Sequence, residues 1–163
     1  MDRKIVGFKL KDEDFGFDIM KVIEIIRLKE ITEVPTAPGF IEGVINLRGK
    51  IIPIIDLRKR FSLETGERDK KFRIIIVEFQ KNQLVGCIVD QVQKVINVNA
   101  EEVLPPPSTV TSIGGKYIES IVQREENIIV LLDIGKIFSE EEQSGLKQVI
   151  ASGGGDIEES INS

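Results

Sequence analysis

The feature that most restricts how this chain folds is an apolar strand pattern that occurs twice. Residues 51–61, "IIPIIDLRKRF", align with residues 128–138, "IIVLLDIGKIF", at an offset of 77. A second match, at an offset of 70, joins Gly16, Val22 and Ile26 to Gly86, Val92 and Ile96. Two units of about 60–65 residues, each with about five short strands, predict two small β-barrels and not one large sandwich. Chance similarity among isoleucine-rich strands is the alternative interpretation.

The composition excludes most familiar catalytic chemistry. The 163 residues contain no histidine, so no Ser-His or Cys-His nucleophile and no His-ligated metal is available. The single cysteine, Cys87, lies in the apolar run "LVGCIVD", which predicts a buried thiol and excludes an internal disulfide or a cysteine-ligated metal site. We therefore expect no cofactor and no metal.

Strand patterns occupy most of the chain. Near-alternation over 5–19 predicts a hairpin, and half of the residues in 22–31 are β-branched, which favours a strand over one helical turn. Gly49 is expected to supply the positive φ of a turn between two strands. Pro53 has no N–H to donate, so its strand is predicted to be an edge strand or to be bulged there. Residues 104–117 are rich in Pro, Gly and Ser and are predicted to form a crossing segment.

Two groups of charged residues leave functional alternatives open. Asp56, Asp90 and Asp133 each follow an apolar strand, where a carboxylate caps the next turn or helix, or serves as an acid or base in an enzyme. We favour capping, because Asp56 and Asp133 occupy matching positions in the repeat. Residues 58–73 hold seven basic and three acidic residues. Nucleic-acid binding there is disfavoured, because the net charge of the chain is −5 and no aromatic residues are interleaved for stacking.

The chain changes character after residue 138. Ser139 and Glu142 form a capping box, and apolar residues at helical spacing predict one helix from 139 to about 151. The remaining residues, "SGGGDIEESINS", are predicted to form a mobile acidic tail. The first residues lack the apolar stretch of a targeting signal, so we expect a cytosolic protein without direct membrane insertion.

Three segments resemble the CheW family, the bacterial chemotaxis adaptors that couple receptors to a histidine kinase. They are "FGFDIMKVIEII", "TAPGFIEGVINLRGKIIPIIDLRKRF" and "LVGCIVDQVQKVINV", and with "LLDIGKIF" the match covers about residues 4 to 138. The resemblance implies two intertwined five-stranded SH3-like barrels with a shared core. It also implies a non-enzymatic scaffold that binds the regulatory domain of the kinase CheA and the cytoplasmic signalling tip of chemoreceptors.

The resemblance also implies particular site residues. Those expected to contact the kinase are Val22, Glu24, Ile25 and Gly43. Those expected to contact the receptor are Asn46, Leu47, Arg48, Gly49, Val85 and Val89. Arg48 is expected to pair with a receptor carboxylate, and a plain hairpin residue is the alternative.

The predicted organisation is one CheW-like domain over 1–138, with repeat halves at about 4–61 and 73–138, followed by the helix and tail over 139–163. The chain is expected to be a monomer in isolation, to be recruited to membrane-associated receptor arrays and not to bind nucleic acid.

Overall fold

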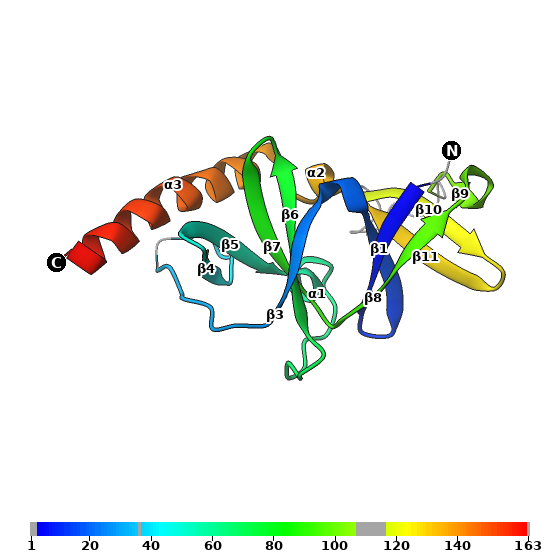
Figure 1. Cartoon of the computed structure of the whole chain (residues 1–163), viewed down its shortest axis with the longest axis horizontal. Coiled ribbons are helices and arrows are strands. Elements are labelled where there is room, and N and C mark those ends of the chain that lie inside the picture. Colours follow the sequence, from blue (N-terminus) through cyan, green and yellow to red (C-terminus); the bar gives the residue numbers. More distant parts are fainter. Residues whose placement is uncertain (1–2, 36, 107–116, 163) are drawn as a thin grey trace.

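The computed structural model describes residues 3–35, 37–106 and 117–162, with the side chains of the last helix described as far as Ala151. β-Strand is the main secondary structure of the described chain, as predicted (Figure 1). In chain order the elements are β1 Arg3–Leu10, β2 Glu13–Asp18, the 3-10 turn η1 Ile19–Lys21, β3 Val22–Arg27, β4 Gly43–Leu47, β5 Lys50–Asp56, α1 Leu57–Arg60, β6 Arg73–Gln80, β7 Gln83–Val89, β8 Gln91–Val98, η2 Ala100–Glu102, β9 Val103–Leu104, β10 Ile118–Arg124, β11 Asn127–Leu132, α2 Ile134–Ile137 and α3 Glu140–Asn162.

The strands form two sheets that lie side by side (Figure 1). The six-stranded sheet has the order β8-β1-β2-β11-β10-β9, and the five-stranded sheet has the order β3-β6-β7-β5-β4. Each sheet takes strands from both halves of the chain, because β2 pairs with β11 and β7 pairs with β5, both in parallel. The predicted intertwined pair of small β units is thus confirmed. The sixth strand is the two-residue β9, which overlaps only at Leu104 with the segment 104–117 that was predicted as a crossing connection.

The sequence repeat has a structural counterpart in these parallel pairs. Ile54 is the partner of Gly86, and Leu131 is the partner of Gly16. Ile54 and Leu131 are 77 residues apart in the sequence, and Gly16 and Gly86 are 70 residues apart. Both sequence matches therefore place their residues at equivalent positions in the two sheets. This agreement is what a duplicated unit requires, and chance similarity does not predict it.

The described residues form three clusters of buried apolar side chains. One lies inside the five-stranded sheet, one inside the six-stranded sheet, and the largest lies between the two sheets and reaches α3. β7 borders two of them: Val85, Cys87 and Val89 face the shared cluster, while Ile88 faces the interior of the five-stranded sheet. Burial on both faces explains why this strand reads as a continuous apolar run and not as an alternation. The predicted burial of Cys87 is confirmed, and burial raises the pKa of its thiol.

The prediction that Pro53 marks an edge or bulge is wrong. β5 lies between β4 and β7, and its pairing with β4 is regular from Gly43 to Lys50. The proline is tolerated because the parallel pairing with β7 starts at Ile54, one residue beyond it.

The helix α3 begins as predicted but continues further. The capping box is present, with the Ser139 amide donating to Glu142 and the Glu142 amide donating to the Ser139 hydroxyl at 3.1 Å. The predicted end near residue 151 is wrong, because α3 runs to Asn162. Glycine weakens a helix but keeps its N–H, so the glycines at 153–155 do not interrupt the backbone hydrogen bonds as a proline would. The part of the predicted crossing segment at 107–116, and the side chains of the predicted acidic tail, lie outside the described residues, so the mobility of the tail stays a prediction.

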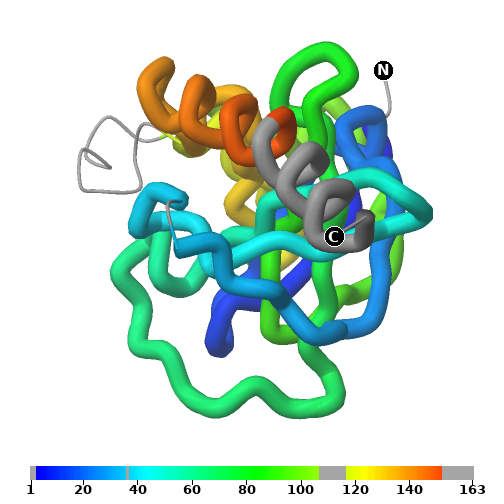
Figure 2. The backbone as a smooth tube through the Cα atoms, turned by 90° about the vertical axis from the view of Figure 1, so that its left-hand side faces the viewer, coloured from blue at the N-terminus to red at the C-terminus, as the bar shows by residue number. Residues whose placement is uncertain are grey.

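α3 docks on the five-stranded sheet (Figures 1 and 2). Leu146 and Val149 join the shared core, and Ile150 lies beside Ile51 and Ile52 of β5. At its start, Glu142 forms an ion pair with Arg60 of α1. The Arg60 guanidinium also donates to the Ile137 carbonyl oxygen at 2.8 Å and lies over the rings of Phe40, Tyr117 and Phe138.

Candidate protein-interaction site

The strand β3 forms one edge of the five-stranded sheet and exposes apolar side chains. It pairs only with β6, so its other edge has no strand partner among the described residues. Burial alternates along it, with Val22 and Glu24 partly covered and Ile23 and Ile25 exposed by 51% and 39%. Met20, just before the strand, is 82% exposed. An apolar strand edge of this kind is a surface that binds protein segments.

The turn that joins β4 to β5 is fixed by its own backbone. Leu47 pairs with Lys50, which leaves Arg48 and Gly49 as a two-residue loop, and both have positive φ, 51° and 85°. Positive φ at both central residues is the geometry of a type I′ hairpin turn. The Asn46 side-chain oxygen accepts a hydrogen bond from the Gly49 amide at 2.9 Å and holds the loop in shape. Gly49 supplies a positive φ as predicted, and Arg48 shares this conformation.

The β3 edge and this turn lie together because the five-stranded sheet curls. The Arg48 guanidinium forms an ion pair with Glu24 of β3. Close by, Lys29 donates to the Asn46 carbonyl oxygen at 3.2 Å, and a short bridge joins Thr32 to β4. The β3 edge and the turn therefore form one surface, which we call the β3–turn surface: Met20, Val22, Ile23, Glu24, Ile25, Asn46, Leu47, Arg48 and Gly49.

The structure supports the placement of most predicted site residues on one surface but removes three from direct contact roles. Gly43 is buried, and a Cβ there would collide with the carbonyl oxygen of Thr32, so its role is to permit close packing. Val85 and Val89 have no exposed surface. Their expected place on a receptor-binding surface is wrong, because β7 is a central strand whose faces both meet core clusters.

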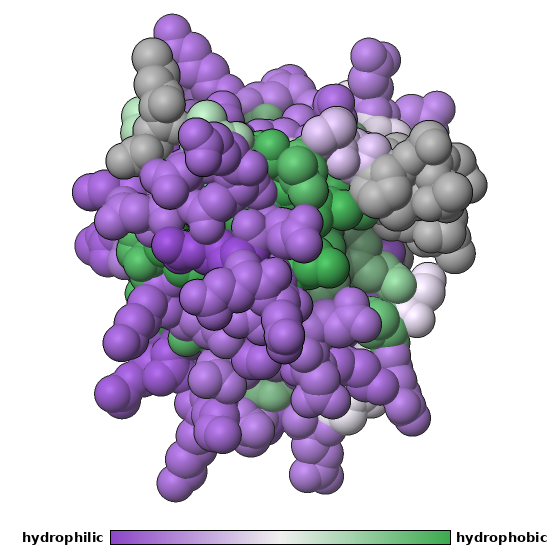
Figure 3. Space-filling view, turned by 90° about the vertical axis from the view of Figure 1, so that its right-hand side faces the viewer, coloured by the Kyte–Doolittle hydropathy of each residue, from purple (hydrophilic) through white to green (hydrophobic). Residues whose placement is uncertain are grey.

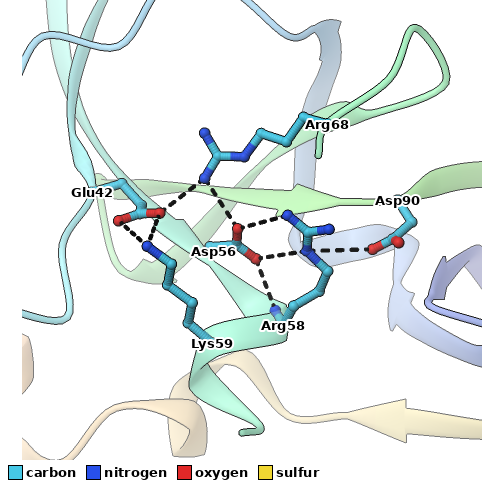
Figure 4. A network of polar contacts seen from close by, with 6 residues as sticks. All are labelled: Glu42, Asp56, Arg58, Lys59, Arg68 and Asp90. Atoms are coloured by element: carbon cyan, nitrogen blue, oxygen red, sulfur yellow. Dashed lines mark hydrogen bonds and ion pairs between the residues drawn. The ribbon is translucent and has the colours of Figure 1, made fainter. Parts of the chain in front are cut away.

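A buried carboxylate network lies on the same sheet, at the end of β5 (Figure 4). Asp56 accepts from the Arg58 amide at 2.9 Å, from the Arg58 side chain at 3.2 Å and from Arg68 at 3.0 Å. The side chains of Asp56 and Arg58 are 0% and 4% exposed, and Arg58 lies over the Phe72 ring at 4.6 Å. Burial by itself raises the pKa of Asp56, but the hydrogen bonds from the two arginines outweigh it and hold the pKa below its usual value.

The three aspartates predicted as caps divide into two groups. Asp56 caps α1, and Asp133 caps α2 through the Gly135 amide at 3.0 Å, so capping is confirmed for both. For Asp90 it is wrong, because β8 starts at the next residue and no helix follows. One carboxylate oxygen of Asp90 is buried without a hydrogen-bond partner, and the nearest cation, Arg58, is 3.8 Å away. Burial raises the pKa of Asp90, with Arg58 opposing it.

The basic segment 58–73 is largely neutralised by the fold. Arg58, Arg60 and Arg68 each form an ion pair with an acidic side chain, and Lys59 pairs with Glu42. Four of the seven basic side chains of this segment are therefore engaged in ion pairs within the fold. In the described part of the chain, no cluster of three or more metal-ligating side chains is present, and no described helix is long and apolar enough to cross a membrane.

Two features of the site were missed by sequence reasoning. The Glu24–Arg48 ion pair joins residues that the sequence assigned to different partners, and only the curl of the sheet brings them together. The exposed Met20 and Ile23 were not singled out, although the alternation of the β3 sequence could have placed Ile23 on the same face as Ile25.

Comparison with known proteins places this arrangement in a family. Residues 4–142, most of the chain, match the family model described as a CheW-like domain. The chain belongs to the CheW family. The CheW family members similar to it include "Chemotaxis protein CheW" of Treponema pallidum, 41% identical over 85% of this chain and 84% of that protein. The same name is given to a protein of Klebsiella aerogenes that is 36% identical over 89% of this chain and 87% of its own length.

A solved CheW structure has the same fold. It is the crystal structure of the scaffolding protein TtCheW from Thermoanaerobacter tengcongensis, with a TM-score of 0.78 and 43% identity over 85% of this chain and 94% of that chain. The sheets and the shared core described above are therefore those of a CheW scaffold.

Proposed function

We propose that this chain is a non-enzymatic cytoplasmic adaptor that couples chemoreceptors to the histidine kinase CheA at membrane-associated receptor arrays. The observation that carries the proposal is the β3–turn surface, in which an exposed apolar strand edge and the "NLRG" turn are joined by the Glu24–Arg48 ion pair. Membership of the CheW family supports it, since relatives are named as chemotaxis proteins and one is described as a scaffolding protein.

The two parts of the surface have different roles in this proposal. The β3 edge binds the CheA regulatory domain through Ile23 and Ile25, since an unpaired strand with exposed aliphatic side chains suits another β protein. The turn residues Asn46 to Gly49 contact the cytoplasmic signalling tip of a receptor. Arg48 forms an ion pair with Glu24 within the chain. We therefore assign Arg48 the role of fixing the turn against β3, and not that of a free guanidinium that binds a receptor carboxylate.

Binding assays with purified partners test the proposal. The chain is mixed with the CheA regulatory domain in a pull-down and with receptor cytoplasmic fragments in a co-sedimentation assay. Ile25→Asp should weaken kinase binding at least about tenfold, because it places a charge where an aliphatic side chain becomes buried. Val95→Asp is the matched control: Val95 is 51% exposed, on the strand of the other sheet that corresponds to β3, and its loss should leave binding within about twofold. If the wild type binds neither the CheA regulatory domain nor the receptor fragments, the proposed function is rejected.

A charge swap separates the two possible roles of Arg48. Arg48→Asp should fold normally, because an ion pair this exposed contributes less than about 1 kcal/mol, but it should lose receptor co-sedimentation. Combining Glu24→Arg with Arg48→Glu restores the pair in reverse. Recovery of binding in the double variant supports the positioning role, whereas continued loss shows that the Arg48 guanidinium itself contacts the partner.

A further inference from the structure

One face of the six-stranded sheet carries an apolar row that runs from the shared core into solvent. Phe15, Val130, Ile121 and Leu104 are successive register partners on β2, β11, β10 and β9, so their side chains share one face. The first three are partly buried and Leu104 is 41% exposed. Ile128, two residues from Val130 on the same face, is 55% exposed. Figure 3, which views the molecule from the side where β9, β10 and β11 lie, shows apolar surface gathered in one area.

The equivalent face of the five-stranded sheet is covered by a helix. By the offset of 77, Ile121 and Ile128 correspond to Val44 and Ile51, which are only 1% and 9% exposed. The cover is α3, whose residues 146–150 pack against β5 and the shared core. The two faces have the same kind of side chains in the same register, but among the described residues a helix lies on only one of them.

The chain supplies no helix of its own to the open face from the equivalent point of the repeat. α3 follows α2, and the segment that follows α1 in the same way is 62–71, which contains no helix. This segment starts beside the β1–β2 turn, where Glu64 pairs with Lys11 at 3.0 Å. It then returns toward β5, where Arg68 reaches Asp56.

The dimensions and charge of the open face define what fits it. A row across four neighbouring strands spans about 14 Å, which is the length of about nine or ten helical residues. The β10–β11 turn at its border carries Glu125 and Glu126, both exposed and neither in an ion pair within the described residues. Arg124 beside them is already paired with Glu102 at 3.0 Å. An occupying helix therefore gains from basic side chains beside its apolar stripe.

We propose that this face is a docking site for an amphipathic helix of another protein, with an aliphatic stripe flanked by Lys or Arg. It lies on a different sheet from the β3–turn surface, and its test does not depend on the proposed function. A second copy of this chain fits less well, because the first turn of α3 carries Glu140, Glu141 and Glu142.

Peptide binding to the full chain tests the site. The probe is a fluorescent peptide of about 14 residues, with Leu at helical i, i+3, i+4, i+7 spacing and Lys elsewhere, since shorter helices are marginal in water. Binding is followed by anisotropy. Ile128→Asp should weaken it at least about tenfold, because a buried aliphatic contact is replaced by a charge. Ile128 is exposed in the free protein, so this variant should fold, and its circular dichroism spectrum should match that of the wild type.

The controls make each outcome decisive. Val95→Asp, equally exposed on the far edge of the same sheet, should leave peptide affinity within about twofold. Equal binding by the wild type and Ile128→Asp, or no binding by the wild type, would overturn the site. A peptide with Glu in place of Lys should bind more weakly, and equal affinity would overturn the charge assignment. Two outcomes would assign the face to a second copy of this chain instead: tight binding of a peptide of residues 139–151, or a wild-type dimer that dissociates in the Ile128→Asp variant.

Discussion

At the scale of single residues, two carboxylates that look alike in sequence have opposite electrostatic situations. Asp56 receives hydrogen bonds from two arginines and a backbone amide in a buried site, and its pKa is lowered. Asp90 has a buried oxygen without a partner, and its pKa is raised. A carboxyl whose folded-state pKa is lowered stabilises the fold when it is charged, and one whose pKa is raised destabilises the fold when it is charged.

Replacing each aspartate by asparagine should therefore change the free energy of unfolding in different directions. Asp56→Asn should lose about 3 kcal/mol at neutral pH, because it leaves Arg58 buried without its counter-charge. The loss should shrink as the pH falls below 3.8, where the wild-type carboxyl itself becomes protonated through its lowered pKa. Asp90→Asn should leave the free energy of unfolding at neutral pH unchanged or raise it.

Urea unfolding of both variants over a range of pH measures these changes. A large loss of stability in Asp90→Asn at neutral pH would contradict the assignment of a carboxylate with one buried, unpartnered oxygen at that position. The same result would mean that the 3.8 Å approach to Arg58 is a stabilising ion pair.

At the scale of elements, the two parallel strand pairs depend on glycines at equivalent positions. A Cβ at Gly86 would lie 2.5 Å from the Ile54 side chain and 2.8 Å from that of Ile74. A Cβ at Gly16 would lie 2.5 Å from the Ile5 side chain. Each glycine thus lets isoleucines of neighbouring strands fill the interior of its own sheet.

Alanine at each of these positions should destabilise the fold by overpacking. We expect Gly86→Ala to cost about 2–3 kcal/mol and Gly16→Ala about 1–2 kcal/mol, because two isoleucines must move in the first case and one in the second. Thermal unfolding followed by circular dichroism measures both. Gly49→Ala is a poor control because its φ is 85°, whereas Gly66→Ala lies in open space and should change stability little. An equally small loss of stability in Gly86→Ala, Gly16→Ala and Gly66→Ala would contradict the packing argument.

The same scale shows which elements the sequence could predict. Strands were placed well where β-branched runs or alternation are strong, and the caps Asp56 and Asp133 followed from their positions after strands. The position of a strand within its sheet was not predictable, because that position does not depend on the strand's own residues. For this reason Pro53 was wrongly assigned to an edge strand, and Val85 and Val89 were wrongly assigned to a surface. The Glu24–Arg48 ion pair was not predictable for a similar reason, since it forms only when the sheet curls.

At the scale of the whole molecule, the exchange of strands between the halves makes the two sheets dependent on each other. The β1–β2 hairpin pairs with β11, and the β6–β7 hairpin pairs with β5, so neither sheet is complete until both halves of the chain are in place. The largest cluster of buried side chains also lies between the sheets and is shared by both. A two-state transition of the whole chain is therefore expected, even though the repeat suggests two units that unfold one after the other.

This expectation is tested most directly when a destabilising substitution lies in one sheet and the spectroscopic reporter lies beside the other. Ile76 is fully buried inside the five-stranded sheet, while the single tyrosine, Tyr117, is 5% exposed in the shared core just before β10 of the six-stranded sheet. Ile76→Ala should cost about 3 kcal/mol of stability through the cavity it leaves. If the sheets unfold together, the urea midpoint from Tyr117 fluorescence must fall as far as the midpoint from circular dichroism. A fluorescence midpoint that stays at its wild-type value would show that the six-stranded sheet survives alone and that strand exchange does not couple the halves.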